Sequence, residues 1–511
     1  MSKLLIKEKL GYAVGDAAAN LVWRGALAYL AVFYTDTFGL TAAAAAMLFL
    51  VVRLSDGVTD IIMGMIADRT STRWGKFRPW ILISTPFLAL FMVLCFTTPD
   101  FSDQNKLIYA YVTYIGLTLA YTLNNVPYSA LMGVMTASAT ERTSLSGFRL
   151  AGAFAGGLLV MGFLPDLVAY FGAGDDSKGY QYSMYLFAAI LMTLMVITFA
   201  TTKERVTPAI DESSNLSTEL KDLCKNLPFI ILPLLATTLF FYYRNLYSGI
   251  FFILIMALMW FAIKRLINQD TKNFSRTQRD MVDLLTNKPW LILLGMGFLT
   301  MMFNGIKYGV IAYYFKYQVG NELMVGQYFI ALLLVSILGA LSTGYLSKKW
   351  GKQNLFITSL MLSGLLTAAF YWVPNGNISA IFILGCSAEF FAAMMPTLFF
   401  SMLGDSADYS EWKNGRRATG LIYSAGTFVQ KTGSGFAGAL VLVVLASYGY
   451  DGMDKSTIEG SLPGMQLLMS WIPAGFAFAG VILMLFYPLS CQQNQDIGEE
   501  LAKRRSLLAP A

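Results

Sequence analysis

The fold of this chain is decided by the stretch Thr41–Trp80, which reads TAAAAAMLFLVVRLSDGVTDIIMGMIADRTSTRWGKFRPW. It begins as an apolar run long enough to span a bilayer, and this run contains Arg53, Asp56 and Asp60. In a helix Asp56 and Asp60 are i and i+4, so both carboxylates project from one face, one turn apart. An ionised group at the centre of a bilayer costs about 2.5–3.5 kcal/mol. Three such groups in one span must face a polar cavity, pair with one another or hold a cation.

The composition is that of a helical membrane protein. The chain has 511 residues, of which 56% are hydrophobic and 13% charged, whereas soluble domains carry about 25% charged residues. Apolar runs of about 20 residues recur from end to end, so an all-α polytopic membrane protein is expected. The absence of histidine excludes a histidine proton relay and a Ser-His-Asp triad. We expect no enzyme activity and no cofactor. Because membrane topology accounts for the net charge of +6, the charge does not indicate a nucleic-acid partner, and we expect none.

The apolar runs predict about 14 spans, arranged as six, an inserted pair and six. We expect an N-terminal bundle at 1–201, a linker at 202–288, a C-terminal bundle at 289–490 and a tail at 491–511. The linker contains a transmembrane hairpin at about 226–263. The predicted spans are 11–35, 41–66, 79–98, 106–130, 148–171, 181–201, 226–243, 245–263, 289–316, 324–347, 354–374, 378–403, 420–447 and 466–488.

The distribution of positive charge predicts the orientation. Of the 37 Lys and Arg residues, 27 lie in the termini and loops of one side, four lie on the other side and six lie within spans. Because cytoplasmic loops carry the excess of Lys and Arg, both termini are expected in the cytoplasm. We expect a monomer in the bacterial inner membrane, surrounded by lipid.

Two loops indicate an internal repeat. RWGK at 73–76 follows the second span, and KWGK at 349–352 follows the second span of the C-terminal six. Each loop comes after a glycine at a helix end, Gly64 in GMIADR and Gly344 in GYLSKK. Similar loops at equivalent positions of two six-span halves indicate parallel repeats.

Several stretches are typical of one family and cover nearly the whole chain apart from the inserted hairpin. They are GYAVGDAAANLVWRGALAYLAVFYTDTFG at 11–39, RLSDGVTDIIMGMIADRTSTRWGKFRPW at 53–80, NVPY at 125–128, Arg149, YYFKYQVG at 313–320, DSADYSEWKNGR at 405–416 and FVQKTGSGFAGAL at 428–440. On these stretches the chain resembles the glycoside–pentoside–hexuronide:cation symporters, the melibiose-permease family within the major facilitator superfamily. The resemblance implies two six-helix bundles, alternating access, and sugar uptake driven by Na⁺ or H⁺.

The resemblance implies a cation site at Asp56 and Asp60, completed by Thr122 of the fourth span. Carboxylate and hydroxyl oxygens suit a small hard cation such as Na⁺. Two carboxylates this close can also share a proton, so H⁺ coupling stays the alternative. Another alternative is that Arg53 neutralises one acid and the group only braces the bundle.

Coupling between cation and sugar is assigned to Lys431 and Arg53. Lys431 corresponds to a family lysine of the eleventh major-facilitator span. A buried lysine needs an acid beside it, so we expect Asp56, Asp60 or Glu389 as its partner, unless the pair is purely structural. Glu389 could instead contact the substrate or bond two helices together.

Sugar recognition is implied at Asp16 of the first span and Arg149 of the fifth. A carboxylate accepts and a guanidinium donates hydrogen bonds to sugar hydroxyls, although the two could also simply brace their helices. Arg24 lies two turns after Asp16 and could bind a substrate carboxylate, pair with an acid or extend toward the membrane surface. Tyr128 is a candidate stacking surface for a sugar ring, together with Trp23, Tyr121 and Trp372.

Two positions depart from the family pattern next to the VPY motif. Asn125 stands where the prototype has its sugar-binding acid, and Ser129 stands where it has an aromatic platform. With the extra cation at Arg24, this favours an anionic or larger glycoside.

Charged residues on the cytoplasmic side predict a gate. Arg69 and Arg73 belong to the loop after the second span, while Asp405 and Asp408 belong to an acidic cluster in the other half. Salt bridges between these groups could close the inner side and break when it opens. The alternative is ordinary positive-inside charge with local helix caps.

We therefore predict a cation-coupled symporter, with Na⁺ favoured, that imports a glycoside or short oligosaccharide. A proton-coupled sugar or uronide symporter and a transporter of lysolipid-type amphiphiles are the alternatives. A membrane sensor or enzyme is disfavoured, because the sequence offers neither an output module nor a catalytic constellation.

Overall fold

The computed structural model describes residues 4–136, 139–205, 236, 246–267, 282–374, 376–415 and 419–508. Within these ranges nine helices are long and apolar enough to cross a membrane. The expected all-α membrane fold is confirmed. The predicted span 226–243 lies almost wholly outside the described residues.

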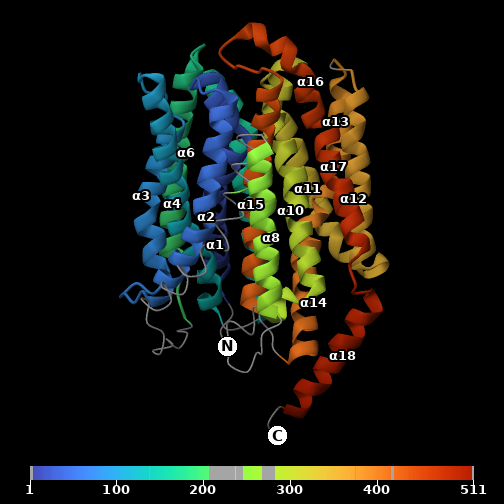
Figure 1. The fold of residues 1–511 in the computed structure, drawn as a ribbon. Helices are drawn as coiled ribbons and strands as arrows, with labels where there is room; N and C mark the ends of the chain where they lie inside the picture. Colours follow the sequence, from blue (N-terminus) through green and yellow to red (C-terminus); the bar gives the residue numbers. More distant parts are fainter. Residues whose placement is uncertain are drawn as a thin grey trace. The chain divides into compact units, whose positions relative to one another are not determined.

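Figure 1 shows the order of the helices along the chain. The first half comprises α1 (Ile6–Gly25), two π-helical turns η1 (Ala26–Leu30) and η2 (Phe33–Thr37), α2 (Ala42–Arg69), α3 (Arg78–Cys95), α4 (Asp103–Met135), α5 (Ala139–Gly172) and α6 (Asp176–Thr201). The second half, which follows α8 (Leu246–Ile267), comprises α10 (Lys288–Tyr313), the π turn η4 (Tyr314–Val319), α11 (Met324–Trp350), α12 (Lys352–Ala369), η5 (Phe370–Trp372), α13 (Ile378–Ala392), α14 (Met394–Asn414), α15 (Thr419–Ser447), η6 (Lys455–Thr457), α16 (Ile458–Met469), α17 (Trp471–Leu485) and α18 (Cys491–Leu508).

Two of the predicted spans are broken helices. The span predicted at 378–403 consists of α13 and the start of α14, and the span at 466–488 consists of the end of α16 followed by α17. Pro396 and Pro473 each lie two residues after the first residue of the second helix. Proline has no N–H and is tolerated in the first turn of a helix, so each pair of helices breaks just before its proline.

The chain divides into two compact units that do not follow its two halves. One unit comprises Met1–Ile230, Tyr308–Leu333 and Gly438–Met465, and the other comprises Ile231–Lys307, Leu334–Ala437 and Gln466–Ala511. In the first unit, the end of α10, the start of α11 and the end of α15 therefore belong with helices of the first half.

Small residues bring α1 and α5 into close contact in the first unit. A Cβ atom at Gly152 would collide with the carbonyl of Ala13, and one at Gly156 would collide with the carbonyl of Ala17. The glycines therefore let the two helix backbones approach closely, as small residues do in membrane bundles. This contact fixes the polar residues of α1 opposite those of α5.

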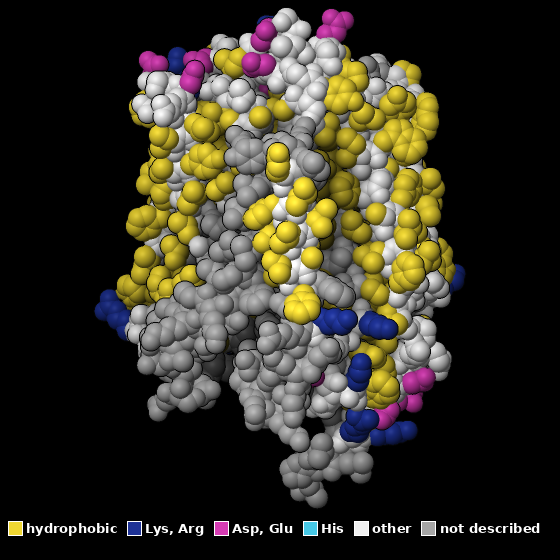
Figure 2. Space-filling model, viewed as in Figure 1, with side chains coloured by type: hydrophobic (Ala, Val, Ile, Leu, Met, Phe, Trp, Pro, Cys, Tyr) yellow, Lys and Arg dark blue, Asp and Glu magenta, His cyan; other side chains and the backbone are white. Residues whose placement is uncertain are grey.

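Large apolar side chains cover the outer faces of the helices, as the visible face in Figure 2 shows. On α8 they are exposed over much of the helix, which is how a helix facing lipid looks in the absence of lipid. Examples on α3, α8 and α11 are Ile83, Phe87, Leu90, Ile250, Ile253, Leu254, Leu258, Phe261, Leu334, Leu338 and Leu341.

A glutamate outside the predicted spans holds the loop between α2 and α3. The Glu204 carboxylate accepts hydrogen bonds from the backbone N–H groups of Lys76, Phe77 and Arg78 at 2.8, 2.8 and 3.0 Å. These N–H groups lie at the start of α3, where a negative charge is favourable. Arg78 in turn donates to the Phe199 carbonyl of α6 at 2.6 Å. The basic loop is thus fastened to the end of α6.

Candidate functional site

Two acids of α2 and one hydroxyl of α4 meet in the first unit. The Thr122 hydroxyl lies 2.9 Å from Oδ1 of Asp60 and 3.3 Å from Oδ1 of Asp56. Asp56 is 3% exposed and Thr122 is 2% exposed. The i, i+4 spacing on α2 has therefore placed both carboxylates on the face that contacts α4.

The hydroxyl of Thr122 has one hydrogen, so it can donate to only one of these two carboxylate oxygens at a time. The other contact is then between two acceptor oxygens, which a shared proton or cation would make attractive. Two carboxylates and a hydroxyl are the donor chemistry that a small hard cation prefers. These residues therefore fit Na⁺, and the same geometry suits a proton.

A small cavity lies beside Asp56. The volume of this cavity is about 20 Å³, and ~10–15 Å³ is enough for one water molecule. Asp56 therefore borders a space that a water molecule or an ion of similar size can occupy. The other lining residues are Val22, Trp23, Ala26, Tyr114, Leu117, Thr118 and Tyr121.

The polar residues of α1 form one continuous chain of contacts. Asp16, Asn20 and Arg24 are spaced four residues apart and so share one face. Asn20 donates to the backbone carbonyl of Asp16 at 2.9 Å, and Arg24 Nε donates to Oδ1 of Asn20 at 3.2 Å. The Arg24 guanidinium lies 5.6 Å from the centre of the Phe154 ring of α5, a cation–π distance.

Arg149 of α5 pairs with Asp16. Its Nε lies 3.2 Å from Oδ1 of Asp16, and its Nη2 donates to the Ser129 hydroxyl of α4 at 3.3 Å. The Asp16 side chain is 9% exposed, and that of Arg149 is 28% exposed. The pair bridges two helices and still leaves part of the guanidinium accessible for a further hydrogen bond.

The aromatic candidates are placed differently from one another. Tyr128 is 0% exposed and stacks on Tyr12 with the ring centres 4.6 Å apart, so in this conformation it packs α4 against α1. Trp23 and Tyr121 stack on each other 5.5 Å apart, next to the Asp56 cavity. Trp372 is 67% exposed at the end of α12, on the outside of its unit.

The residues assigned to coupling are described in part. Lys431 lies half-buried on α15, and Asn125 lies half-buried on α4. The side chain of Arg53 lies outside the described residues, as does that of Arg69. Glu389 of α13 pairs with Lys307 of α10. Lys307 was not predicted from the sequence as its partner.

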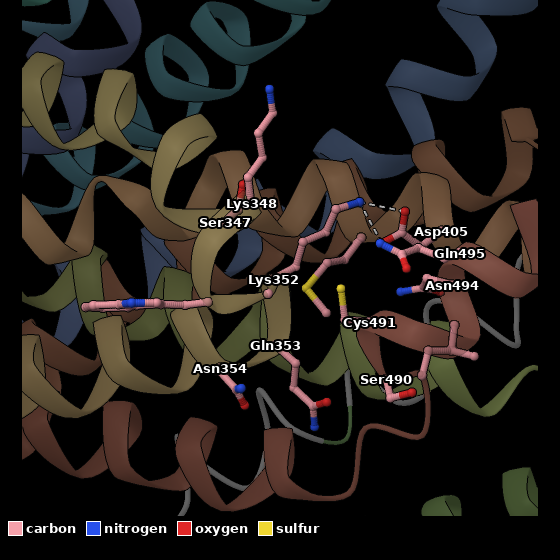
Figure 3. Close-up of a pocket in the computed structure, with 14 residues that line it drawn as sticks. Ser347, Lys348, Lys352, Gln353, Asn354, Asp405, Ser490, Cys491, Asn494 and Gln495 are labelled. Carbon is pink, nitrogen blue, oxygen red and sulfur yellow. Dashed lines mark hydrogen bonds and ion pairs between the residues drawn. The ribbon is translucent and has the colours of Figure 1, made fainter.

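One end of the second unit contains a polar pocket, shown in Figure 3. Its volume is about 540 Å³ and its lining comes from α11, α12, α14 and α18. On its wall Lys352 Nζ contacts both carboxylate oxygens of Asp405, at 2.7 and 2.8 Å. Asp405, one of the predicted gate acids, is therefore engaged with α12 of its own unit. Asp408 is half-buried on α14, three residues after Asp405, while Arg73 is exposed with its guanidinium 4.8 Å from the centre of the Trp74 ring.

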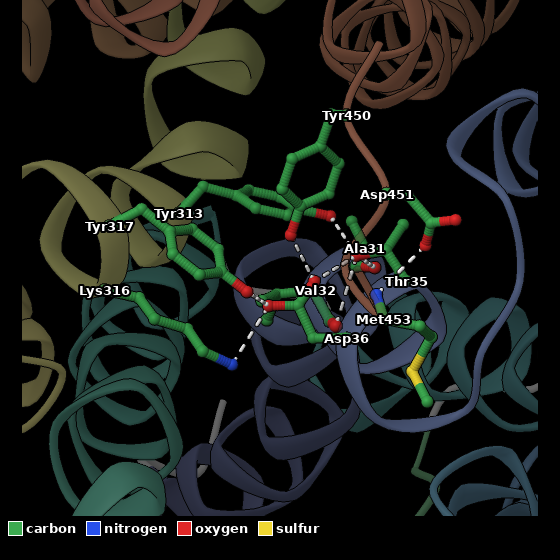
Figure 4. Close-up of polar contacts among 10 residues, drawn as sticks. All are labelled: Ala31, Val32, Thr35, Asp36, Tyr313, Lys316, Tyr317, Tyr450, Asp451 and Met453. Atoms are coloured by element: carbon green, nitrogen blue, oxygen red, sulfur yellow. Dashed lines mark hydrogen bonds and ion pairs between the residues drawn. The ribbon is translucent and has the colours of Figure 1, made fainter. Parts of the chain in front are cut away.

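A buried carboxylate of η2, at the far end of the first predicted span, was not among the residues predicted from the sequence. Figure 4 shows Asp36 of η2 at the centre of a polar cluster in the first unit. It accepts hydrogen bonds from Tyr317 of η4 and from Tyr450 of the loop after α15, and its Oδ2 lies 3.0 Å from Lys316 Nζ. The Asp36 side chain is 2% exposed. One carboxylate therefore ties together three segments that are distant in sequence.

The donors around Asp36 are themselves held in place. Burial raises the pKa of Tyr450, and the Asp36 charge raises it further, so this hydroxyl stays protonated and donating. Thr35 contacts Tyr313 at 2.9 Å between the two hydroxyl oxygens and also donates to Asp36 at 2.7 Å. The signal available in the sequence was the pair of helix-end glycines Gly39 and Gly320, which mark equivalent helix ends in the two halves.

A family model described as "MFS/sugar transport protein" matches residues 11–244 and 234–491. The two matches together cover most of the chain, including both six-span halves.

Curated relatives and solved structures point the same way. The chain is 31% identical over 507 residues to a protein of Escherichia coli strain K12 named as a candidate glycoside/cation symporter, YagG, covering 99% of this chain and 97% of the relative. It is 31% identical over 490 residues to the isoprimeverose transporter of Lactiplantibacillus pentosus, covering 94% and 88%. A solved structure from work on proton dependent oligopeptide transporters has a TM-score of 0.63 at 13% identity, covering 94% of this chain and 97% of that one, and shows the fold alone.

Proposed function

This chain belongs to the MFS/sugar transport family, and from this premise we propose that it imports a glycoside or short oligosaccharide together with Na⁺ by alternating access. The family match confirms the resemblance to the glycoside–pentoside–hexuronide:cation symporters. The protein is a multi-pass membrane transporter and not an enzyme. We place it in the bacterial inner membrane with both termini in the cytoplasm, on the charge distribution of its loops.

The observation that supports cation coupling is the position of Thr122 against both Asp56 and Asp60. Two carboxylates and a hydroxyl thus converge on one place, which is the donor set that a small hard cation prefers. A structural brace needs only one acid, whereas a second acid on the same face is useful if a cation binds and leaves. The name of the YagG relative includes a cation, which supports a cation as the coupling ion without specifying which one.

The sugar contact is supported by the Asp16–Arg149 pair. It offers a carboxylate that accepts and a guanidinium that donates, which together can hold neighbouring hydroxyls of a sugar ring. Arg24 is held on the same face of α1 through Asn20. An anionic glycoside would gain an ion pair there. The isoprimeverose relative supports a saccharide as the cargo.

Alternating access requires that one side closes while the other opens. By the predicted orientation Asp36 lies toward the outside, at the end of the first span. The Asp36 cluster joins η2, η4 and the loop after α15, so we assign it to the closed state of the outer gate. The inner gate predicted at Arg69, Arg73, Asp405 and Asp408, and the coupling role of Lys431, stay predictions.

Uptake of a panel of neutral and uronic glycosides into membrane vesicles tests the proposal. We expect Asp56→Asn and Asp60→Asn to abolish stimulation by Na⁺. Thr122→Val should raise the half-saturating Na⁺ concentration about 10- to 150-fold, since a hydrogen bond to a charged group is worth about 1.5–3 kcal/mol. Thr113→Val is the matched control, because that hydroxyl of α4 bonds the carbonyl of Tyr109 in its own helix.

The outcomes separate the coupling ions. Uptake that follows a pH gradient and ignores Na⁺, yet is lost in the same aspartate variants, would replace Na⁺ by H⁺. Full Na⁺ stimulation in both aspartate variants would overturn the cation site itself.

A further inference from the structure

Three buried polar side chains of the second unit have no role in the function proposed so far. Lys307 Nζ of α10 lies 3.4 Å from Oε2 of Glu389 of α13, and the Ser336 hydroxyl of α11 donates to Oε1 of Glu389 at 2.9 Å. The three residues are 3%, 4% and 4% exposed. Lys307 Nζ also lies 4.9 Å from the centre of the Phe303 ring. Ionisable side chains inside a membrane bundle are costly and usually functional, so this lysine and this glutamate are candidates for a functional role.

The helices of this triad are the repeat counterparts of those that hold Asp56 and Thr122. Asp56 lies eight residues before Gly64, the glycine near the end of α2, and Ser336 lies eight residues before Gly344, its equivalent in α11. α4 and α13 correspond as parts of the fourth predicted span of each half, but the distances to the next proline differ. Thr122 lies five residues before a proline of α4, and Glu389 lies seven residues before the proline that follows α13.

Each half therefore has one hydroxyl–carboxylate hydrogen bond between its second and fourth spans, with the two roles exchanged. In the first half the carboxylate is on the second span and the hydroxyl of Thr122 is on the fourth, 2.9 Å from Asp60. In the second half the hydroxyl of Ser336 is on the second span and the carboxylate of Glu389 is on the fourth.

Lys307 has a counterpart as well. It lies 13 residues before Gly320, and Ala26 lies 13 residues before Gly39. Both glycines have positive φ, 75° and 88°, and each lies within two residues after the last π turn of its span. Ala26 lines the cavity beside Asp56. Where the first half has a methyl group next to a small cavity, the second half has a lysine whose ammonium reaches the carboxylate.

We propose that Lys307, Ser336 and Glu389 form a cation site whose cation is the ammonium group of Lys307. Removing that group turns Glu389 and Ser336 into a second, exchangeable site for a monovalent cation of the Na⁺ or Li⁺ class. The comparison of the halves rests on the proposed cation site at Asp56 and Asp60, but the triad itself does not. The consequence is that the native transporter exchanges a cation in one half only.

The test uses the full-length protein in detergent and a hydrophobic carbodiimide, which reacts with a buried carboxyl group in its protonated form. A cation held by the carboxylate keeps it ionised and so protects it. Modification of Glu389 is followed by mass spectrometry in NaCl, LiCl and choline chloride. In the wild type Glu389 should be unreactive in all three salts. In Lys307→Ala it should react in choline, and Na⁺ at ten times its dissociation constant should slow the reaction about tenfold. Lys307→Arg is the matched control and should behave as the wild type.

Two results would overturn the proposal: equal modification of Lys307→Ala in Na⁺, Li⁺ and choline, or Na⁺-protected modification of wild-type Glu389. If Lys307→Ala folds poorly in choline, thermal unfolding measured with and without Na⁺ replaces the modification assay. Na⁺ should raise its melting temperature and should not raise that of Lys307→Ala/Glu389→Gln; equal shifts would count against the site.

The background Asp56→Asn/Asp60→Asn separates this inference from the proposed function. Protection of Glu389 by Na⁺ in Lys307→Ala must persist there, because the two sites lie on different helices. Loss of protection in that background would overturn the second site. Na⁺-stimulated uptake by the aspartate variants with the native Lys307 would instead overturn the proposed function alone.

Discussion

Asp36→Asn is the sharpest test of the outer gate. The Asp36 carboxylate is 2% exposed and binds Tyr317 and Tyr450, with Lys316 3.0 Å away. Asparagine keeps the size of the side chain, but it has one accepting oxygen and no charge. Its one amide oxygen therefore cannot replace both carboxylate oxygens, of which one accepts from Tyr317 of η4 and the other from Tyr450. The η2 turn should therefore separate more easily from η4 and from the loop after α15.

The structure sets the size of the effect. A hydrogen bond to a charged group is worth about 1.5–3 kcal/mol, and the ion pair adds less because the Lys316 side chain is 21% exposed. Since the amide retains part of the hydrogen bonding, we expect the closed gate to lose about 2–4 kcal/mol relative to the open one. At about 1.4 kcal/mol per factor of ten, the ratio of closed to open gates falls about 30- to 700-fold.

A single cysteine measures this change. Asn20→Cys, in a chain whose native cysteines are replaced, puts a thiol 16 residues before Asp36, which is about 24 Å along a helix. A membrane-impermeant maleimide added to intact cells reaches that thiol only when the outer gate is open. Asp36→Asn should raise its labelling rate at least about tenfold. It should also slow sugar uptake, because the outer gate must close before the inner side opens.

Asp175→Asn is the control. Asp175 belongs to the loop between α5 and α6 on the same predicted side. It caps its own helix, accepting from the Lys178 N–H at 3.2 Å and pairing with the Lys178 ammonium at 3.1 Å. Its removal should leave the labelling rate unchanged. An unchanged rate in Asp36→Asn, with normal amounts of protein in the membrane, would refute the gate. So would an equal increase in both variants, since the effect would then belong to any acid on that side.

Three further substitutions test the rest of the structure. Gly156→Val should put a side chain into the carbonyl of Ala17, separate α5 from α1 and lower the melting temperature of the purified protein, whereas a value equal to wild type would contradict the close α1–α5 contact. Arg149→Lys should weaken sugar binding at least about tenfold while leaving Na⁺ binding intact, because lysine lacks the planar fork; isothermal titration with sugar and with Na⁺ separates the two. Glu204→Gln should cost about 1 kcal/mol at the start of α3, seen as a lower thermal midpoint, and an unchanged midpoint would contradict the capping role.

The parts of the site that the sequence could predict are those with local spacing or a strong family motif. The i, i+4 spacing of Asp56 and Asp60 predicts their shared face, and the structure brings Thr122 to it. Asp16 and Arg149, 133 residues apart, were paired through the resemblance, and the structure has them 3.2 Å apart. Whether these groups hold an ion and a sugar is a matter for the uptake experiments.

The parts that could not be predicted depend on contacts between distant segments. Asp36 and its partners Tyr317 and Tyr450 are separated by 281 and 414 residues, and no local pattern distinguishes their side chains from ordinary helix-end polar groups. Glu389 was one of three acids expected to pair with Lys431, and its own role was left open. In the structure Lys307 lies 3.4 Å from Glu389 although the two residues are 82 apart in the sequence.

The π turns explain why a regular α-helical projection of the first span does not predict the face on which Asp36 lies. A π turn inserts one extra residue into a helix, and at 3.6 residues per turn each insertion rotates every following side chain by about 100°. The first span contains two of them, η1 and η2, before Gly39, and α10 ends in a third, η4, before Gly320. A straight helix drawn from Asp16 would therefore place Asp36 on the wrong face. The π turns rotate Asp36 toward Tyr317, which lies three residues before Gly320 as Asp36 lies three residues before Gly39. The two halves thus meet at this end of the bundle through the same position of the repeat, with an acceptor in one half and a donor in the other.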